Sequence, residues 1–127
     1  MRLNQVTVAS RDVARAAAFY EALGLELIVR DLPSYVRFRC PDGDSTFSVE
    51  LDVDTVGGGG TTVYFECDDL DARVIRLKAL GIAFECDPVD QPWLWREARL
   101  RDPDGNWLCL FKAGTNRLDP PWRIRSG

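Results

Sequence analysis

The side chains that could perform chemistry in this chain are carboxylates, thiols and aromatic rings, because its 127 residues contain no histidine. Imidazole is the usual general base near neutral pH and the commonest metal ligand, so Ser-His-Asp and Cys-His hydrolases and His-based zinc, haem and iron sites are excluded. Cys40, Cys67, Cys86 and Cys109 lack the CxxC spacing of zinc and thioredoxin-like sites. We therefore expect them to be reduced thiols in the interior of a cytoplasmic protein.

Glu50 is the candidate catalytic residue. It alternates with Val49 and Leu51 in a strand-like segment, which places its carboxylate on the polar face of that strand. A buried carboxylate there would bind a cation or act as a base with a raised pKa. The alternative is a carboxylate held by a hydrogen bond to Gln5 or Thr62.

Cys109 is a second candidate. It alternates with Leu108 and Leu110, which again places it on a polar face. A thiol becomes a nucleophile when a neighbouring positive charge lowers its pKa. The alternative is a packed, unreactive thiol.

Aromatic and polar side chains indicate where a ligand would lie. Trp93 and Trp95 are two residues apart and share a face of one expected strand, so with Trp107 on the next strand they could wall an aromatic pocket. Packing in the core or in a dimer interface is the alternative. Tyr64 and Glu66 lie on the polar face of another expected strand and are further candidate ligand contacts.

The chain contains the same unit twice. Asp12 and Asp69 each precede a helical segment, and Gly24 and Gly81 each end one, with both pairs 57 residues apart. The later turns are 62 residues apart, and the offset falls to about 59 at the last strand. The expected helices cover residues 13–23 and 70–80, and the expected strands cover residues 3–9, 26–30, 35–40, 47–52, 62–67, 83–86, 94–101 and 107–111.

These elements predict an α+β fold in which two βαβββ modules pair to form a curved mixed-sheet half-barrel around a cleft. The first module covers about residues 1–56 and the second about residues 61–112. A glycine-rich linker, residues 57–60, connects them. Residues 113–127 form a tail.

The repeated pattern resembles the vicinal oxygen chelate (VOC) superfamily, which includes glyoxalase I, bleomycin-resistance proteins and extradiol dioxygenases. The resemblance covers residues 1–112. The motifs that carry it are Arg11-Asp12-Val13, Phe19-Tyr20-Glu21-Ala22-Leu23-Gly24-Leu25, Asp68-Asp69-Leu70-Asp71, Leu80-Gly81 and Asp102-Pro103-Asp104-Gly105-Asn106. Many reactions share this scaffold, so the resemblance predicts the fold more strongly than the activity.

The resemblance implies four metal-ligand positions, on the first, fourth, fifth and eighth strands. They fall on Gln5, Glu50, Thr62 and Cys109. Gln5 and Glu50 are ordinary ligand types, but a neutral hydroxyl and a thiol replace the usual His and Glu at the other two positions. We therefore expect a degenerate metal site, with Gln5 and Glu50 as its remaining ligands.

Two functions follow from this resemblance. The first is a small-molecule-binding protein of the glyoxalase/bleomycin-resistance type. It has no cofactor, and its ligand is a small organic molecule, for which the class of organic cations is open. The second is a lyase, isomerase or dioxygenase that depends on a divalent metal, namely Zn, Ni, Mn or Fe. A structural or regulatory module without ligand chemistry is a third alternative.

The charge distribution bears on the partners. A net charge of −4 argues against a nucleic-acid partner, and no apolar run approaches the ~20 residues that span a bilayer. Residues 112–127 carry a net charge of +3, which leaves −7 on residues 1–111. We expect a cytoplasmic homodimer in which the tail, with Trp122 and Ile124, packs on the acidic body or on the partner subunit, the alternative being a solvated tail.

Overall fold

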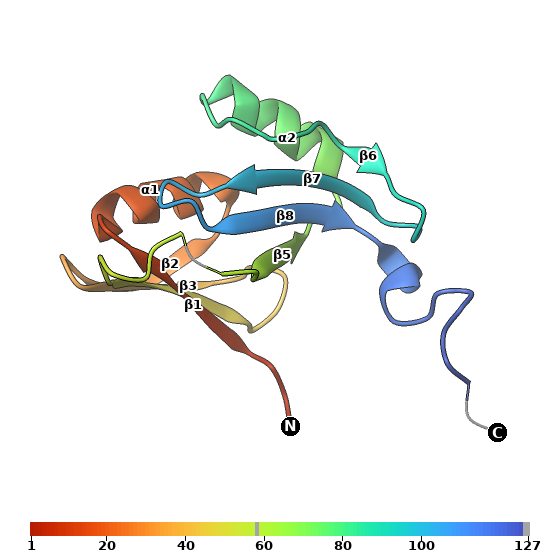
Figure 1. Cartoon of the computed structure of the whole chain (residues 1–127), viewed down its shortest axis with the longest axis horizontal. Helices are drawn as coiled ribbons and strands as arrows, with labels where there is room; N and C mark the ends of the chain where they lie inside the picture. Colours follow the sequence, from red (N-terminus) through yellow and green to blue (C-terminus); the bar gives the residue numbers. More distant parts are fainter. Residues whose placement is uncertain (58, 126–127) are drawn as a thin grey trace. The chain divides into compact units, whose positions relative to one another are not determined.

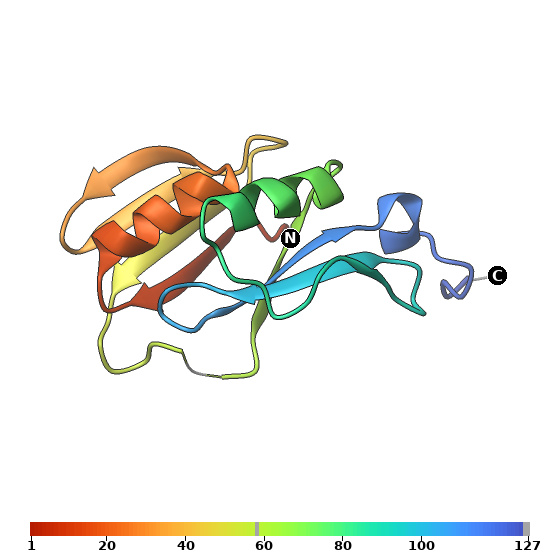
Figure 2. The same cartoon turned by 90° about the horizontal axis from the view of Figure 1, so that it is seen from above.

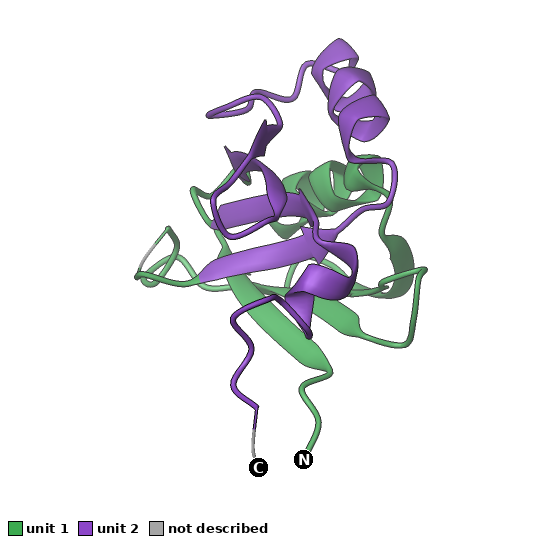
Figure 3. Ribbon diagram, turned by 90° about the vertical axis from the view of Figure 1, so that its right-hand side faces the viewer, with its two compact units in different colours: residues 1–61, 102–106 green, residues 62–101, 107–127 purple. Residues whose placement is uncertain are grey.

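The computed structural model describes residues 1–57 and 59–125, and its contacts divide it into two compact units (Figure 3). The first unit contains residues 1–61 and 102–106, and the second contains residues 62–101 and 107–127. Gly58 of the expected linker and residues 126–127 of the expected tail lie outside the described residues. No helix within the described part of the chain is long and apolar enough to cross a membrane.

The first unit is a four-stranded mixed sheet with one helix. Its elements are β1 (Gln5–Ser10), α1 (Val13–Leu23), β2 (Glu26–Asp31), β3 (Tyr35–Arg39) and β4 (Thr46–Leu51) (Figure 1). The strand order is β1-β4-β3-β2, with β1 parallel to β4 and the other pairs antiparallel. The expected helix over residues 13–23 is confirmed. Its start is capped by Asp12, which accepts a hydrogen bond from the Arg15 backbone amide, and Gly24 ends it in the left-handed region at φ 111°.

The core of the first unit lies between α1 and the apolar face of the sheet. Tyr20 is fully buried, and its ring lies 4.6 Å from that of Phe47 and 6.1 Å from that of Phe38. Val36 and Val49 are buried with them. Because strand side chains alternate, the opposite face of the sheet carries the polar residues.

Residues 102–106, the turn that follows β7, belong to the first unit. The Tyr20 hydroxyl donates to Asp102 Oδ2 at 2.6 Å, the Arg11 amide donates to Asp104 Oδ1 at 2.9 Å, and Asn106 Nδ2 donates to the Ala9 carbonyl at 3.1 Å. Burial, together with the Asp102 carboxylate, raises the pKa of Tyr20. The Asp-Pro-Asp-Gly-Asn motif therefore forms a turn and is also hydrogen-bonded to β1, to α1 and to Arg11 between them.

The second unit repeats this architecture. Its elements are β5 (Thr62–Glu66), α2 (Leu70–Ala79), β6 (Val89–Asp90), β7 (Arg96–Arg101), β8 (Trp107–Lys112) and the 3₁₀ helix η1 (Gly114–Arg117), with strand order β5-β8-β7-β6. β5 is parallel to β8, and the other pairs are antiparallel. Figure 2 shows α2 and the segment that leaves the sheet after β8.

Three expectations for the second unit are wrong in detail. The expected strand over residues 83–86 does not form, and the two-residue β6 takes its place, after Pro88, which lacks a backbone donor. The expected strand over residues 94–101 begins at Arg96, because Leu94 adopts φ 68°. Asp69 precedes α2 but makes no capping hydrogen bond; its carboxylate pairs with Arg73 instead.

The predicted α+β class and the two βαβββ modules are confirmed. Each module is an open four-stranded sheet with one helix. The pairing of the modules around a cleft stays a prediction.

Candidate functional site

The strand registers define which residues of the two units correspond. Gln5 pairs with Thr46, and its counterpart Thr62 pairs with Trp107. Thr46 on β4 therefore corresponds to Trp107 on β8. Two residues further along each strand, Ser48 corresponds to Cys109, an offset of 61 residues. The offset of about 59 expected at the last strand is thus wrong, and the sequence reasoning missed Ser48.

Gln5 and Glu50 are not brought together. Both are exposed, and the Gln5 amide oxygen accepts a hydrogen bond from the Thr46 hydroxyl at 2.8 Å. Glu50 pairs in register with Ala9, four residues along β1 from Gln5, which corresponds to about 13 Å of strand. The expectation of a buried Glu50 is wrong: it lies near the end of β4, between Ala9 on β1 and Tyr35 on β3, and its side chain is exposed.

The open face of the first sheet carries a hydrogen-bonded row of polar groups. The Tyr35 and Ser48 hydroxyls are 2.6 Å apart, and Ser48 is fully buried. Arg37 Nε donates to the Tyr35 hydroxyl at 2.9 Å. Arg37 and Ser48 are register partners, so the row crosses from β3 to β4.

Cys109 is a packed thiol. It is 0% exposed, and burial and the neighbouring Glu97 carboxylate raise its pKa to about 12, although Arg99 acts in the opposite direction. The thiolate is the nucleophile, so at neutral pH this buried thiol is a poor one.

Glu97 is a buried carboxylate that the sequence reasoning missed. It is 1% exposed and accepts hydrogen bonds from Trp93 Nε1 at 2.7 Å and from Arg99 Nη2 at 3.2 Å. Arg99 Nη2 also donates to the Tyr64 hydroxyl at 3.1 Å. Glu97 is the second residue of β7 and lies on the face opposite Ala98 and Leu100. Its position on the polar face of a central strand was the signal in the sequence that could have identified it.

Three aromatic rings form a cluster on the open face of the second sheet. Trp95 stacks on Phe111 with ring centroids 4.6 Å apart, and Tyr64 meets both rings edge-on at 6.0 and 5.7 Å. The Trp95 indole donates to the Asn116 carbonyl at 3.3 Å. Tyr64 is 42% exposed, so the cluster, which we call the Tyr64–Trp95–Phe111 cluster, has an accessible edge.

The other predicted aromatic residues lie elsewhere on the second unit. Trp107 is four residues along β8 from Phe111, and the Arg101 guanidinium lies 3.8 Å from its ring centroid. Trp93 lies before β7 and donates to Glu97. The three tryptophans therefore do not form one wall.

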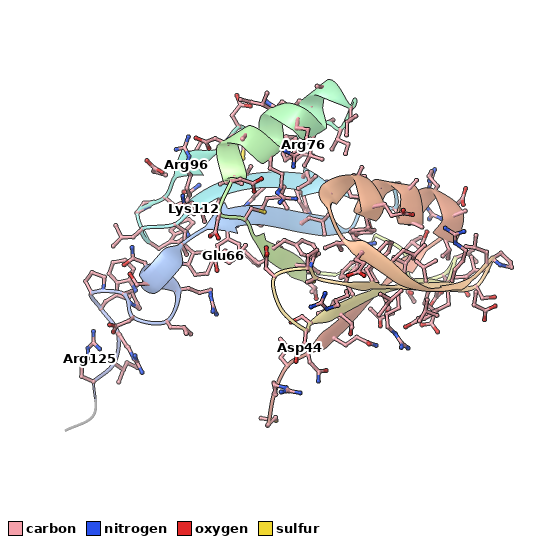
Figure 4. All side chains as sticks on the ribbon, turned by 180° about the vertical axis from the view of Figure 1, so that it is seen from behind. Asp44, Glu66, Arg76, Arg96, Lys112 and Arg125 are labelled. Atoms are coloured by element: carbon pink, nitrogen blue, oxygen red, sulfur yellow. The ribbon has the colours of Figure 1, made fainter. Side chains whose placement is uncertain are left out.

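Glu66 fastens the C-terminal segment to the second unit (Figure 4). Its Oε2 accepts hydrogen bonds from the backbone amides of Ala113 at 3.0 Å and Gly114 at 3.1 Å, and its Oε1 lies 3.5 Å from Arg117 Nε. Both carboxylate oxygens are thus engaged. Trp122 and Ile124, further along the tail, are exposed.

The four positions that the family uses for a metal do not fit one in this chain. Thr62 offers only a neutral hydroxyl, the Cys109 thiol is buried with its pKa raised to about 12, and Gln5 and Glu50 are offset along their strands. Within residues 1–57 and 59–125, no three carboxylate or thiol side chains gather as a metal site would require.

The family model of the glyoxalase/bleomycin resistance protein/dioxygenase superfamily matches residues 2–110. No curated protein matches the chain.

Solved structures share the fold across most of the chain. A bleomycin-binding protein complexed with bleomycin is 26% identical, covers 88% of this chain and 98% of its own, and has a TM-score of 0.71. A bleomycin resistance determinant encoded on the transposon Tn5 is 25% identical, with coverages of 90% and 99% and a TM-score of 0.73. A lactoylglutathione lyase from Agrobacterium tumefaciens is 21% identical, with coverages of 93% and 96% and a TM-score of 0.74, a likeness of fold.

Proposed function

The chain belongs to the glyoxalase/bleomycin resistance protein/dioxygenase superfamily, and on that basis we propose that it binds a small organic molecule without a metal ion. The observation that carries this proposal is the Tyr64–Trp95–Phe111 cluster, which presents an aromatic edge on the polar face of the second sheet. Ligand sites combine apolar and aromatic walls with a few polar groups, and Arg99 and Glu97 supply the polar groups beside this cluster. The bleomycin-binding protein among the similar structures supports the same class of function.

The donors at the family's metal positions support binding without a metal. A neutral hydroxyl is a poor ligand for Zn, Ni, Mn or Fe, and the buried Cys109 thiol would have to lose a proton whose pKa is raised to about 12. The register partners of Glu50 are the neutral residues Ala9 and Tyr35. The predicted ligand contacts Gln5, Thr62 and Trp107 lie on the open faces but outside the cluster. Glu66 holds the tail, so we assign it a structural role at the edge of the site.

A planar aromatic molecule is the ligand class that fits the cluster. Rings stack offset or edge-to-face at centroid distances of about 4.5–7 Å, and the exposed edge of Tyr64 leaves one such position open. The Tyr64 hydroxyl already accepts a hydrogen bond from Arg99, which holds the ring in place for a ligand. Preorganisation of this kind reduces the entropy lost on binding.

Calorimetric titration with bleomycin and with 2-naphthol, a neutral planar probe, tests the proposal. We expect Trp95→Ala to weaken binding of the probe by about two- to tenfold, because an aromatic contact contributes roughly 0.5–1.5 kcal/mol beyond its buried area. Trp122→Ala removes an exposed tryptophan from the tail and is the matched control, for which we expect no change. Equal affinities for Trp95→Ala and the unchanged protein would contradict the proposal.

The alternative function, a metal-dependent lyase, isomerase or dioxygenase, makes a different prediction. It requires stoichiometric Zn, Ni, Mn or Fe in the purified protein and loss of that metal in Glu50→Ala. We also propose that the protein is a cytoplasmic homodimer, which sedimentation and cell fractionation would test.

A further inference from the structure

The two sheets carry an arginine at the same position of their open faces. Arg37 on β3 is the register partner of Ser48, and Arg99 on β7 is the register partner of Cys109. Each guanidinium also donates to a tyrosine hydroxyl, Arg37 to Tyr35 at 2.9 Å and Arg99 to Tyr64 at 3.1 Å. The arginine position is therefore duplicated, although the two phenol partners come from different strands: Tyr35 lies on β3 and Tyr64 on β5.

In the second unit this arginine has a counter-ion. Glu97 precedes Arg99 by two residues on β7, and its buried carboxylate lies 3.2 Å from Arg99 Nη2. A buried charge is tolerated when it is paired and hydrogen-bonded, and both conditions hold for this pair.

In the first unit the described residues provide no such counter-ion. The residue two positions before Arg37 is Tyr35, so a neutral phenol occupies the place that Glu97 occupies in the second unit. The described residues place no carboxylate within ion-pair distance of Arg37, which is half-buried. A phenol accepts a hydrogen bond but does not neutralise a guanidinium.

The neighbouring acidic residue does not fill the gap. Glu50 is diagonal to Arg37, since it is the register partner of Tyr35, and it is exposed. Arg39, two residues further along β3, has its own carboxylate partner, Glu26, at 3.4 Å. Arg37 is thus distinguished from the other arginine of its strand by the lack of a negative partner.

We propose that Arg37 binds the anionic group, a carboxylate or a phosphate, of a small organic molecule on the open face of the first sheet. Nε is already engaged by Tyr35, which leaves the two Nη groups to form the paired donors that a planar oxyanion accepts. The hydroxyl pair of Tyr35 and Ser48 adjoins this position. The proposal goes beyond the aromatic site of the second unit and does not depend on it.

Nuclear magnetic resonance of the arginine Nε–Hε groups tests this site, with benzoate as the probe and benzamide as its neutral counterpart. The Arg37 signal is assigned as the one that disappears in Arg37→Gln. At constant ionic strength we expect benzoate, but not benzamide, to shift this signal saturably. Inorganic phosphate as a second probe separates recognition of any oxyanion from recognition of a carboxylate.

Variants of β3 provide the controls. Measured by calorimetry, benzoate affinity should fall at least about tenfold in Arg37→Gln, because hydrogen bonds between two charged groups are lost. Arg39→Gln makes the same charge change two residues away and should alter the affinity by less than about twofold, as expected when screened charges alone change. Glu50→Gln should raise the affinity, since it removes a negative charge that repels benzoate. Arg37→Lys keeps the positive charge but not the paired donors, so it should give an intermediate loss. This variant tests the site if Arg37→Gln fails to fold.

An equal shift with benzamide, or equal losses in Arg37→Gln and Arg39→Gln, would overturn the proposal, as would the absence of saturable benzoate binding. Binding of 2-naphthol to the Tyr64–Trp95–Phe111 cluster is measured separately through Trp95→Ala. Failure of the anion site therefore leaves the aromatic site untouched, and the converse also holds.

Discussion

Tyr20→Phe removes a single oxygen atom and tests how the first unit holds residues 102–106. The Tyr20 hydroxyl is buried and donates to Asp102 Oδ2 at 2.6 Å. A hydrogen bond to a charged group contributes about 1.5–3 kcal/mol, and Asp102 Oδ2 keeps only Asn106 Nδ2, at 2.8 Å, as a donor after the change. We expect the free energy of unfolding to fall by about 2 kcal/mol, which for a chain of this size lowers Tm by roughly 6–10 °C.

The pH dependence provides an independent readout of the same contact. Because the pKa of Tyr20 is raised in the folded protein, the unfolded chain loses this proton first as the pH rises through about 10. The stability that Tyr20 contributes is therefore complete below pH 10 and falls above it by about 1.4 kcal/mol per pH unit. Tyr20→Phe should lack this one-proton slope.

Urea unfolding between pH 7 and pH 11, followed by circular dichroism, measures both effects. Phe19→Leu is a suitable control, since it changes the adjacent aromatic residue without altering a hydrogen bond to Asp102. If Tyr20→Phe matched the unchanged protein in stability at pH 7 and in slope above pH 10, the assigned role of this hydrogen bond would be refuted.

Two further predictions concern the second unit. Glu66→Gln should release the C-terminal segment, because the amides of Ala113 and Gly114 and the Arg117 guanidinium lose their common carboxylate; faster trypsin cleavage at Arg117 would show this, and an unchanged cleavage rate would refute it. Cys109 should resist Ellman's reagent at pH 8, because its thiol is buried and its pKa is about 12, while half-buried Cys86 reacts; a Cys109→Ala variant that loses a fast-reacting thiol would contradict this.

Local signals made much of the fold predictable from the sequence. Asp12 and Gly24 mark the ends of α1 because capping acts through neighbouring backbone groups. Their recurrence at Asp69 and Gly81 revealed the second module. Where the sequence reasoning went wrong, a single residue changed the backbone: the left-handed φ of Leu94 breaks the alternation that had placed Trp93 and Trp95 on one strand face.

The candidate site was harder to predict because its contacts join residues distant in the sequence. The loop between β3 and β4 is one residue longer than that between β7 and β8, so Ser48 rather than Glu50 corresponds to Cys109. The partners of Glu66 are backbone amides nearly 50 residues later, which no side-chain pattern reveals.

The residue two positions earlier decides whether the arginine has a counter-ion, since Tyr35 precedes Arg37 and Glu97 precedes Arg99; that comparison requires both registers. Neither Arg37 nor Arg99 was among the residues singled out from the sequence. The presence of a counter-ion for one and not for the other required the structure.

Metal-independent ligand binding is the central claim, and a paired titration tests it most directly. The affinity for 2-naphthol would be measured calorimetrically on protein stripped with a chelator and on the same protein after addition of Zn, Ni, Mn or Fe. We predict equal affinities, because the Tyr64–Trp95–Phe111 cluster requires no metal to form its contacts. Binding that disappears on stripping and returns with one stoichiometric metal ion would contradict the claim.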